Sequence, residues 1–267
     1  MPTMLALKLV DATEEKQREL IRTSAQHARA IDHFRQNIAD VETVDQLMAD
    51  PELYGFVMRA FDLEDQIFGK ALMSKMLKSD ISDPDALVNR LSDPRFKELY
   101  RSLEFGTDGV NTLKTLSRRW QDMVVDRYVT RQFIDGNDAQ NAIVGRALEF
   151  REKAGSVNNV YDILKDRDLS NVLRTALGIP DSVAGIDIDK QADIFLKKLD
   201  LADLKDPAKV EKLMRRYTAI ADAQSGPAAL AGNAAVTLLN AAASGGGWLP
   251  VTIDISAISA LPSNPYR

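Results

Sequence analysis

The chain has 267 residues, of which 45% are hydrophobic and 27% charged, so it can bury at least one sizeable core. Its 34 basic and 39 acidic residues give a net charge of −5, which argues against a general binder of nucleic acid or anionic membranes. It contains no cysteine and only two histidines. Disulfides, a thiol nucleophile and thiolate metal sites are therefore excluded, and a histidine-rich metal centre has little room.

The first predicted helix runs from Asp11 to about Ile38. Asp11 followed by Glu14 has the spacing of a capping box, in which two side chains bond the free amides at a helix start. The helix carries a largely apolar seam with steps of three or four residues: Leu20, Ser24, His27, Ile31, Phe34 and Ile38. This seam predicts either a short coiled coil with a partner or packing against the chain's own domain.

Four Asp-Pro pairs mark further predicted helix starts. Aspartate accepts hydrogen bonds from the free amides of a first turn, and proline at the next position has no amide hydrogen to leave unbonded. Apolar residues at helical spacing follow each pair, so we expect helices to begin at Asp50-Pro51, Asp83-Pro84, Asp93-Pro94 and Asp206-Pro207.

The second half of the chain also reads as mostly helical. A long helix is predicted over residues 109–133, followed by a turn at Asp135-Gly136-Asn137-Asp138. The Ala-rich stretch 228–243 predicts a helix that either docks a partner helix or is buried in the chain's own core. Alternation over residues 249–258 predicts a short strand or an extended tail, with irregular residues at 262–267.

The sequence repeats itself at an offset of 116 residues. Residues 33–53 align without a gap with residues 149–169, and identities continue to Ala60 and Ala176. The matching positions are mainly apolar or helix-starting, so the duplication indicates a repeated fold rather than repeated chemistry. The predicted fold is an all-α, multi-helix bundle of two related helical units with a short extended C-terminal tail. Its predicted parts are an N-terminal helix at 1–30, helical unit 1 at 31–105, linking helices at 106–146, helical unit 2 at 147–220, and an Ala/Gly-rich helix with the tail at 221–267.

No recognised catalytic, cofactor or metal motif occurs in the sequence. Phosphate-binding glycine loops, the His-Glu-x-x-His zinc motif and a nucleophile with a base at recognisable spacing are all missing. His27 and His33 lie six positions apart on one helix and point in different directions, so they cannot share a metal ion. We therefore predict no catalytic residues, no cofactor, no bound metal and no enzyme activity.

Two small charged groups have alternative interpretations. Asp62, Glu64 and Asp65 could support acid–base chemistry, but they lie where a helix start near Glu64 attracts negative charge, and we favour that role. Residues 118–120 form a basic-aromatic patch that is either a solvated helix face or a partner contact. The candidate partner contacts over the whole chain are Leu20, Ile31, Phe34, Ile38, Arg118, Arg119, Trp120 and Trp248.

Three stretches resemble a known family: Val-Asp-Gln-Leu-Met-Ala-Asp-Pro-Glu-Leu at 44–53, Ala-Phe-Asp-Leu at 60–63 and Asn-Arg-Leu-Ser-Asp-Pro-Arg-Phe at 89–96. In them the chain resembles an uncharacterised, domain-of-unknown-function bacterial family, seen mostly in alphaproteobacteria and often encoded among flagellar genes. The resemblance covers about residues 25–260 and implies an all-helical fold. The motifs of the family carry no known catalysis, so no active-site residue is transferred to this chain.

The leading functional hypothesis is a non-enzymatic structural, assembly or accessory protein of the bacterial flagellum, acting in motility through protein–protein contacts. One alternative is a small-ligand-binding protein or enzyme with a cleft between the two helical units. Another is a cargo of the flagellar export apparatus.

We expect a protein partner, such as a flagellar component, no nucleic acid and no membrane span, with the oligomeric state open. Residues 1–10 lack the features of a secretory signal, so the cytoplasm is the default location. Association with the flagellum and export by its apparatus are the alternatives.

Overall fold

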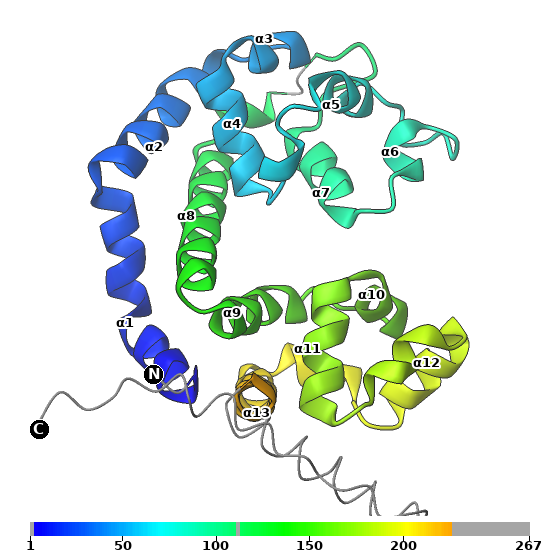
Figure 1. Ribbon diagram of the computed structural model, residues 1–267. Coiled ribbons are helices and arrows are strands. Elements are labelled where there is room, and N and C mark those ends of the chain that lie inside the picture. The colour runs from blue at the N-terminus through cyan, green and yellow to red at the C-terminus, as the bar shows by residue number, and fades with distance from the viewer. Residues whose placement is uncertain (1–2, 111–112, 226–267) are drawn as a thin grey trace, which may run out of the picture. The chain divides into compact units, whose positions relative to one another are not determined.

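The computed structural model describes residues 3–110 and 113–225 (Figure 1). Within these ranges the secondary structure is helical without a strand, which confirms the predicted all-α fold class. Isolated bridge residues are the exception, among them the antiparallel pair Thr43 and Val110. The predicted helix at 228–243, the strand or tail at 249–258 and the irregular residues at 262–267 lie outside the described residues.

The helices have the following bounds. The first seven are α1 (Thr3–Thr23), α2 (Ala25–Asn37), α3 (Val44–Ala49), α4 (Pro51–Ala60), α5 (Lys70–Leu77), α6 (Leu87–Arg90) and α7 (Pro94–Leu103). They are followed by α8 (Arg118–Gln140), α9 (Ala142–Ala154), α10 (Val160–Lys165), α11 (Arg167–Leu177), α12 (Ile188–Leu196) and α13 (Pro207–Ser225). Residues Met1–Asp222 form one compact unit, and Ala223–Arg267 are assigned to a second.

Three of the four Asp-Pro pairs start helices as predicted. The aspartates of these pairs each accept a hydrogen bond from a main-chain amide in the first turn: Asp50, Asp93 and Asp206. The prediction at Asp83-Pro84 is wrong, because α6 begins only at Leu87. The Asp83 carboxylate instead accepts a hydrogen bond from the amide of Asp85 at 2.9 Å and closes a local turn. Aspartate favours such turns as well as helix caps, so the two structures compete at this position.

Asp50→Ala is expected to lower the free energy of unfolding by about 1 kcal/mol, because the amides of Glu52 and Leu53 lose their acceptor. The matched control is Asp83→Ala, at the pair that starts no helix, where we expect a change below about 0.5 kcal/mol. Urea unfolding measures both values. Equal losses for the two variants would contradict the capping role of Asp50.

The predicted single helix from Asp11 to Ile38 is in fact two helices. α1 begins earlier, at Thr3, whose amide donates to Asp222 Oδ2 at 2.7 Å. The helix is interrupted at Ser24, which has an extended ψ of 142° and whose hydroxyl donates to the carbonyl of Ile21 at 3.1 Å. A serine hydroxyl that bonds a nearby main-chain carbonyl in this way competes with the main-chain hydrogen bonds that would continue the helix.

The predictions around α8 are wrong at both ends. Residues 113–117 lie outside the α-helix, with Leu113 at a φ of +70°, and α8 begins only at Arg118 behind the cap residue Ser117. The predicted turn at Asp135-Gly136-Asn137-Asp138 lies inside α8, which continues to Gln140. Asn137 is buried there and donates from its side chain to the carbonyl of Phe133 at 2.8 Å.

α8 passes through two separate hydrophobic cores. The first core joins α2 to α7 with residues of α8 from Trp120 to Val129. The second joins Leu7 and Val10 of α1 to the end of α8, from Phe133 on, and to the later helices. Val124 and Phe133 are nine residues apart, about two and a half turns, so α8 buries opposite faces in its two halves.

Local geometry recurs at the offset of 116 residues. α3 and α10 both begin with capping boxes, at Thr43 and Asn159, and α4 and α11 both begin behind aspartate caps. After α4 and α11, the two halves of the repeat turn through left-handed positions at Asp62 (φ 58°) and Gly178 (φ 61°). The unit boundaries at 31–105 and 147–220 stay a prediction.

Candidate functional site

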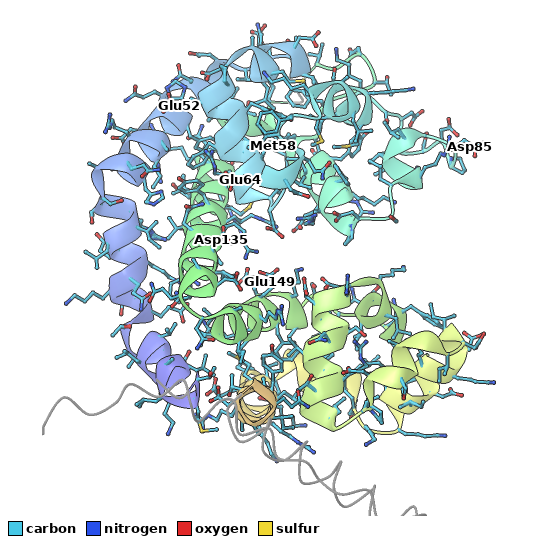
Figure 2. The ribbon with its side chains drawn as sticks, in the orientation of Figure 1. Glu52, Met58, Glu64, Asp85, Asp135 and Glu149 are labelled. Atoms are coloured by element: carbon cyan, nitrogen blue, oxygen red, sulfur yellow. The ribbon has the colours of Figure 1, made fainter. Side chains whose placement is uncertain are left out.

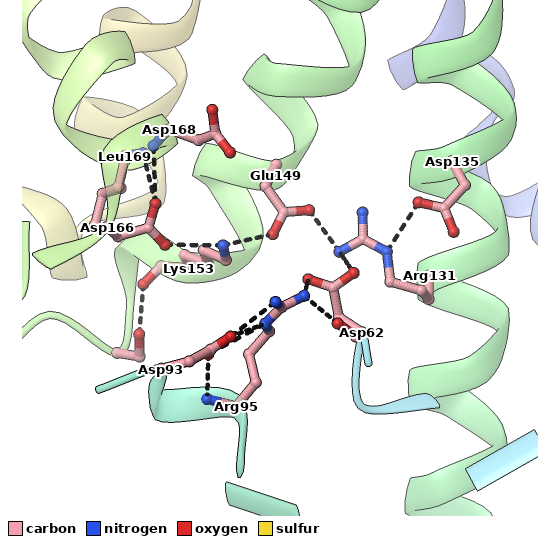
Figure 3. Close-up of polar contacts among 11 residues, drawn as sticks. Asp62, Asp93, Arg95, Arg131, Asp135, Glu149, Lys153, Asp166, Asp168 and Leu169 are labelled. Carbon is pink, nitrogen blue, oxygen red and sulfur yellow. Dashed lines mark hydrogen bonds and ion pairs between the residues drawn. The ribbon is translucent and has the colours of Figure 1, made fainter. Parts of the chain in front are cut away.

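Nine ionisable side chains gather where α8 passes from the first core to the second. All of them except Asp65 are labelled in Figure 3. Six are carboxylates and three are bases, and they come from segments before, within and after α8. We call them the junction cluster: Asp62, Asp65, Asp93, Arg95, Arg131, Asp135, Glu149, Lys153 and Asp166.

Arg131 is the centre of the junction cluster. Its side chain is 14% exposed and lies on α8 between Val129 of the first core and Phe133 of the second. Its guanidinium contacts three carboxylates: Glu149 Oε2 at 2.6 Å, Asp135 Oδ1 at 3.0 Å and Asp62 Oδ1 at 3.6 Å. It thereby ties α8 to α9 and to the turn after α4.

The other two bases extend the cluster on either side of Arg131. Lys153 Nζ bridges Glu149 Oε1 at 2.9 Å and Asp166 Oδ2 at 2.8 Å, while the other oxygen of Asp166 caps α11. Arg95 contacts Asp93 Oδ2 at 2.7 Å and the main-chain oxygen of Asp62. Each of these two bases therefore contacts the aspartate that caps a helix, α11 for Lys153 and α7 for Arg95, and also a second acidic residue.

The carboxylates of the junction cluster are not equivalent electrostatically. Burial alone raises the pKa of Glu149, but Arg131 and Lys153 outweigh it and hold this pKa below the ordinary value. Burial raises the pKa of Asp62 and of Asp135, and the negative charge of Glu149 adds to this rise. Asp93 and Asp166 also have pKa values below the ordinary one, because hydrogen bonds and the neighbouring bases outweigh their burial. The cluster thus contains three carboxylates that the fold favours as anions beside two that it disfavours.

This difference gives Asp135→Asn and Glu149→Gln opposite expected effects at pH 7.5. The raised pKa of Asp135 stabilises the fold at pH values below the ordinary 3.8, and this stabilisation is lost as the pH rises. At pH 7.5 the charged Asp135 therefore contributes no stability, and Asp135→Asn should be at least as stable as the wild type. A lowered pKa stabilises the fold above the ordinary value of 4.5, so Glu149→Gln should be less stable. Urea midpoints at several pH values measure both. The Asp135→Asn difference should shrink as the pH falls toward 3.8, and the Glu149→Gln difference only as the pH falls below 4.5. A Glu149→Gln variant that keeps wild-type stability at pH 7.5 would contradict this assignment.

Part of the junction cluster has a counterpart in the first half of the repeat. At the offset of 116, Glu149 and Asp166 correspond to His33 and Asp50. There His33 Nε2 contacts Asp50 Oδ2 directly at 2.7 Å, with no base between them. In the second half Lys153 bridges the pair, and Glu149 is left with an oxygen for Arg131.

The structure buries four of the candidate partner contacts. Ile31, Phe34, Ile38 and Trp120 belong to the first core with exposed fractions of 8% or less, so we correct their assignment from partner contacts to core residues. The physical reason is ring packing: Phe34 stacks on Phe56 at 4.6 Å between ring centres. Three other candidates are exposed and one lies outside the described residues; these are Leu20, Arg118 and Arg119, and Trp248.

Sequence reasoning missed the junction cluster as a unit. It singled out Asp62 and Asp65 but assigned them to a helix start, and a single 3-10 turn does begin at Glu64. The pairing of Asp62 with Arg131 joins residues 69 positions apart and leaves no local pattern. The available signal was in the repeat, where Glu149 and Lys153 stand at the positions of His33 and Asn37.

A surface depression of about 590 Å³ lies along α8, and no residue of the junction cluster lines it. Two of its acidic residues, Asp122 and Asp126, already pair with Arg35 and Arg22. Within residues 3–110 and 113–225, no three acidic or histidine side chains are grouped to hold a metal ion. None of the helices in those ranges combines the length and the apolar character that crossing a membrane requires.

The comparisons with known proteins identify the family. The family described as "Protein of unknown function (DUF1217)" matches residues 60–210, more than half of the chain. The chain belongs to the DUF1217 family. The matched region of DUF1217 contains the whole junction cluster.

A solved structure supports this assignment. The crystal structure of protein AGR_C_984 from Agrobacterium tumefaciens is similar, with a TM-score of 0.73 and 30% identity, over 85% of this chain and 96% of that chain. No protein with a curated description matches the sequence. The resemblance to an uncharacterised, all-helical alphaproteobacterial family is thus confirmed as DUF1217.

Proposed function

We propose that this DUF1217 protein is a non-enzymatic structural, assembly or accessory protein of the bacterial flagellum that works through contacts with other proteins. Two lines of support lead to this proposal. The sequence resembles a family often encoded among flagellar genes, and the surface carries an aromatic side chain that the fold does not use.

That side chain is Phe68, and it is the structural observation that carries the part of the proposal concerning contacts with other proteins. Phe68 is 97% exposed at the turn before α5, whereas the other eight phenylalanines of the chain are buried. Leu72, one helical turn later, is 36% exposed. Large aromatic side chains that remain in water without a partner are frequent anchors of protein interfaces.

The test is a deletion of the gene in its own host, complemented with wild-type protein, Phe68→Ser or Leu196→Ser. Leu196 is 50% exposed on α12 and serves as the matched control for the loss of an exposed apolar side chain. We expect the deletion to impair flagella and swimming, and wild type and Leu196→Ser to restore them. Phe68→Ser should fold normally but fail to restore swimming.

Normal flagella and swimming in the deletion strain would overturn the proposal. Recovery of the intact protein from the culture supernatant would instead favour a cargo of the export apparatus. Restoration by Phe68→Ser at wild-type efficiency would leave the flagellar role standing and remove Phe68 from it.

A further inference from the structure

α8 holds in helical form a sequence that is typical of a turn. Asp135-Gly136-Asn137-Asp138 combines residues that favour turns with a glycine inside the helix, where it weakens helix formation. A Cβ atom at Gly136 would meet nothing within 4 Å, so close packing does not require glycine there. Such a conflict between local preference and fold marks a place where the structure is held by its surroundings.

The same stretch lies where apolar packing between the two cores is interrupted. Val129 is the last residue of α8 in the first core, and the second core begins at Phe133. Among the described residues, no buried side chain belongs to both cores, although the partly buried Ile21 packs against each. The orientation of one core relative to the other therefore depends on α1, on α8 and on polar contacts.

Polar contacts of Arg131 span this stretch of α8. Arg131 precedes this stretch on α8. Asp135 is its first residue, and Glu149 follows it on α9 (Figure 2). The Arg131–Asp135 pair at 3.0 Å joins successive turns of α8, and the Arg131–Glu149 pair at 2.6 Å holds α9 against α8. Because both groups of the second pair are 14% exposed, water screens this attraction only partly.

The α8–α9 corner shows how closely the two helices approach. Asn141 ends α8 and caps α9, accepting the amides of Ile143 and Val144. A Cβ atom on Gly145 would lie 2.3 Å from Asp138 Oδ1, so only glycine permits this approach. Asp138, the last residue of the turn-like stretch, therefore packs closely against Gly145 of α9. This packing and the Arg131–Glu149 pair both hold α9 against α8.

We propose that residues 135–138 are a hinge in α8 and that the Arg131–Glu149 ion pair is the latch that keeps it helical. When the latch is released, the stretch unwinds and the second core changes its orientation relative to the first. This device is independent of the proposed function, because it rests on contacts of α8 and α9 and not on Phe68.

Hydrogen–deuterium exchange of the full chain tests the hinge. We expect amides 133–138 to exchange faster than amides 122–129 of the same helix. Gly136→Ala should slow their exchange about fivefold, because alanine favours the helix over glycine and has free space here. Glu149→Gln should speed it up.

The matched control is Gly155→Ala, at the end of α9, where a Cβ atom also meets nothing within 4 Å. It should leave exchange at 133–138 unchanged. Two results would overturn the hinge. One is equal exchange of amides 122–129 and 133–138 in the wild type. The other is exchange of amides 133–138 that changes neither with Gly136→Ala nor with Glu149→Gln.

A distance measurement tests the latch by a second route. The chain contains no cysteine, so spin labels at Asp85→Cys and Ser182→Cys attach only at these exposed sites beside the two cores. We expect one narrow distance distribution in the labelled parent, a broader one with Glu149→Gln, and an unchanged one with Gly155→Ala. A distribution that stays narrow with Glu149→Gln would refute the latch.

Discussion

Phe34→Ala is expected to lower the free energy of unfolding by about 3–5 kcal/mol, the usual loss for a large aromatic side chain removed from a core. Phe34 is 0% exposed and stacks on Phe56, with 4.6 Å between ring centres. Phe56 stacks in turn on Tyr128 of α8 at 4.2 Å. A cavity at Phe34 therefore weakens the packing between α2, α4 and α8, and urea unfolding monitored by circular dichroism measures the loss.

Phe68→Ala is the matched control, since it removes the same atoms from a side chain that is 97% exposed. We expect its free energy of unfolding to lie within about 0.5 kcal/mol of the wild-type value. Similar losses at the two positions would mean that Phe34 does not support the core as its burial indicates.

Arg131→Met is expected to cost about 3 kcal/mol, the lower end of the loss seen when one partner of a buried ion pair is removed. Glu149, which is 14% exposed, loses the guanidinium at 2.6 Å but remains charged and largely buried. Asp62 and Asp135 lose the same neighbour, so three carboxylates are left with less compensation. Urea unfolding at pH 7.5 gives the value.

Arg22→Met tests whether this loss is specific to the junction cluster. Arg22 also bonds a carboxylate of α8, that of Asp126, but the two side chains are 37% and 66% exposed. An exposed pair of this kind contributes less than about 1 kcal/mol. If both variants lose equally little, the junction cluster is no more than a set of surface ion pairs.

Helix starts illustrate what local sequence predicts well. Asp50, Asp93 and Asp206 cap helices as expected, because capping depends on atoms two or three residues away. Asp83 has the same Asp-Pro pattern, yet its carboxylate closes a turn to Asp85. The same short-range bonds support both outcomes, and the packing of the following residues selects between them.

α8 shows where periodicity misleads. A helix that packs on one core carries one apolar stripe, but α8 buries Val124 in the first core and Phe133 on the opposite face in the second. The stripe therefore breaks in mid-helix, and Asp135-Gly136-Asn137-Asp138 adds a strong turn signal at that point. The contacts that surround this part of α8, such as the Arg131–Glu149 pair with α9, come from residues distant in sequence and leave no local pattern.

The sequence by itself determined the all-α fold class, most capped helix starts and the repeated pattern at an offset of 116, since each depends on neighbours along the chain. The tertiary structure alone decided which apolar residues are core, as for Phe34, and which remain in water, as for Phe68. It also assembled the junction cluster, in which Asp62, Arg131 and Glu149 come from different elements. Ion pairs across such separations follow from how helices pack, and packing distances are not encoded in any local spacing of residues.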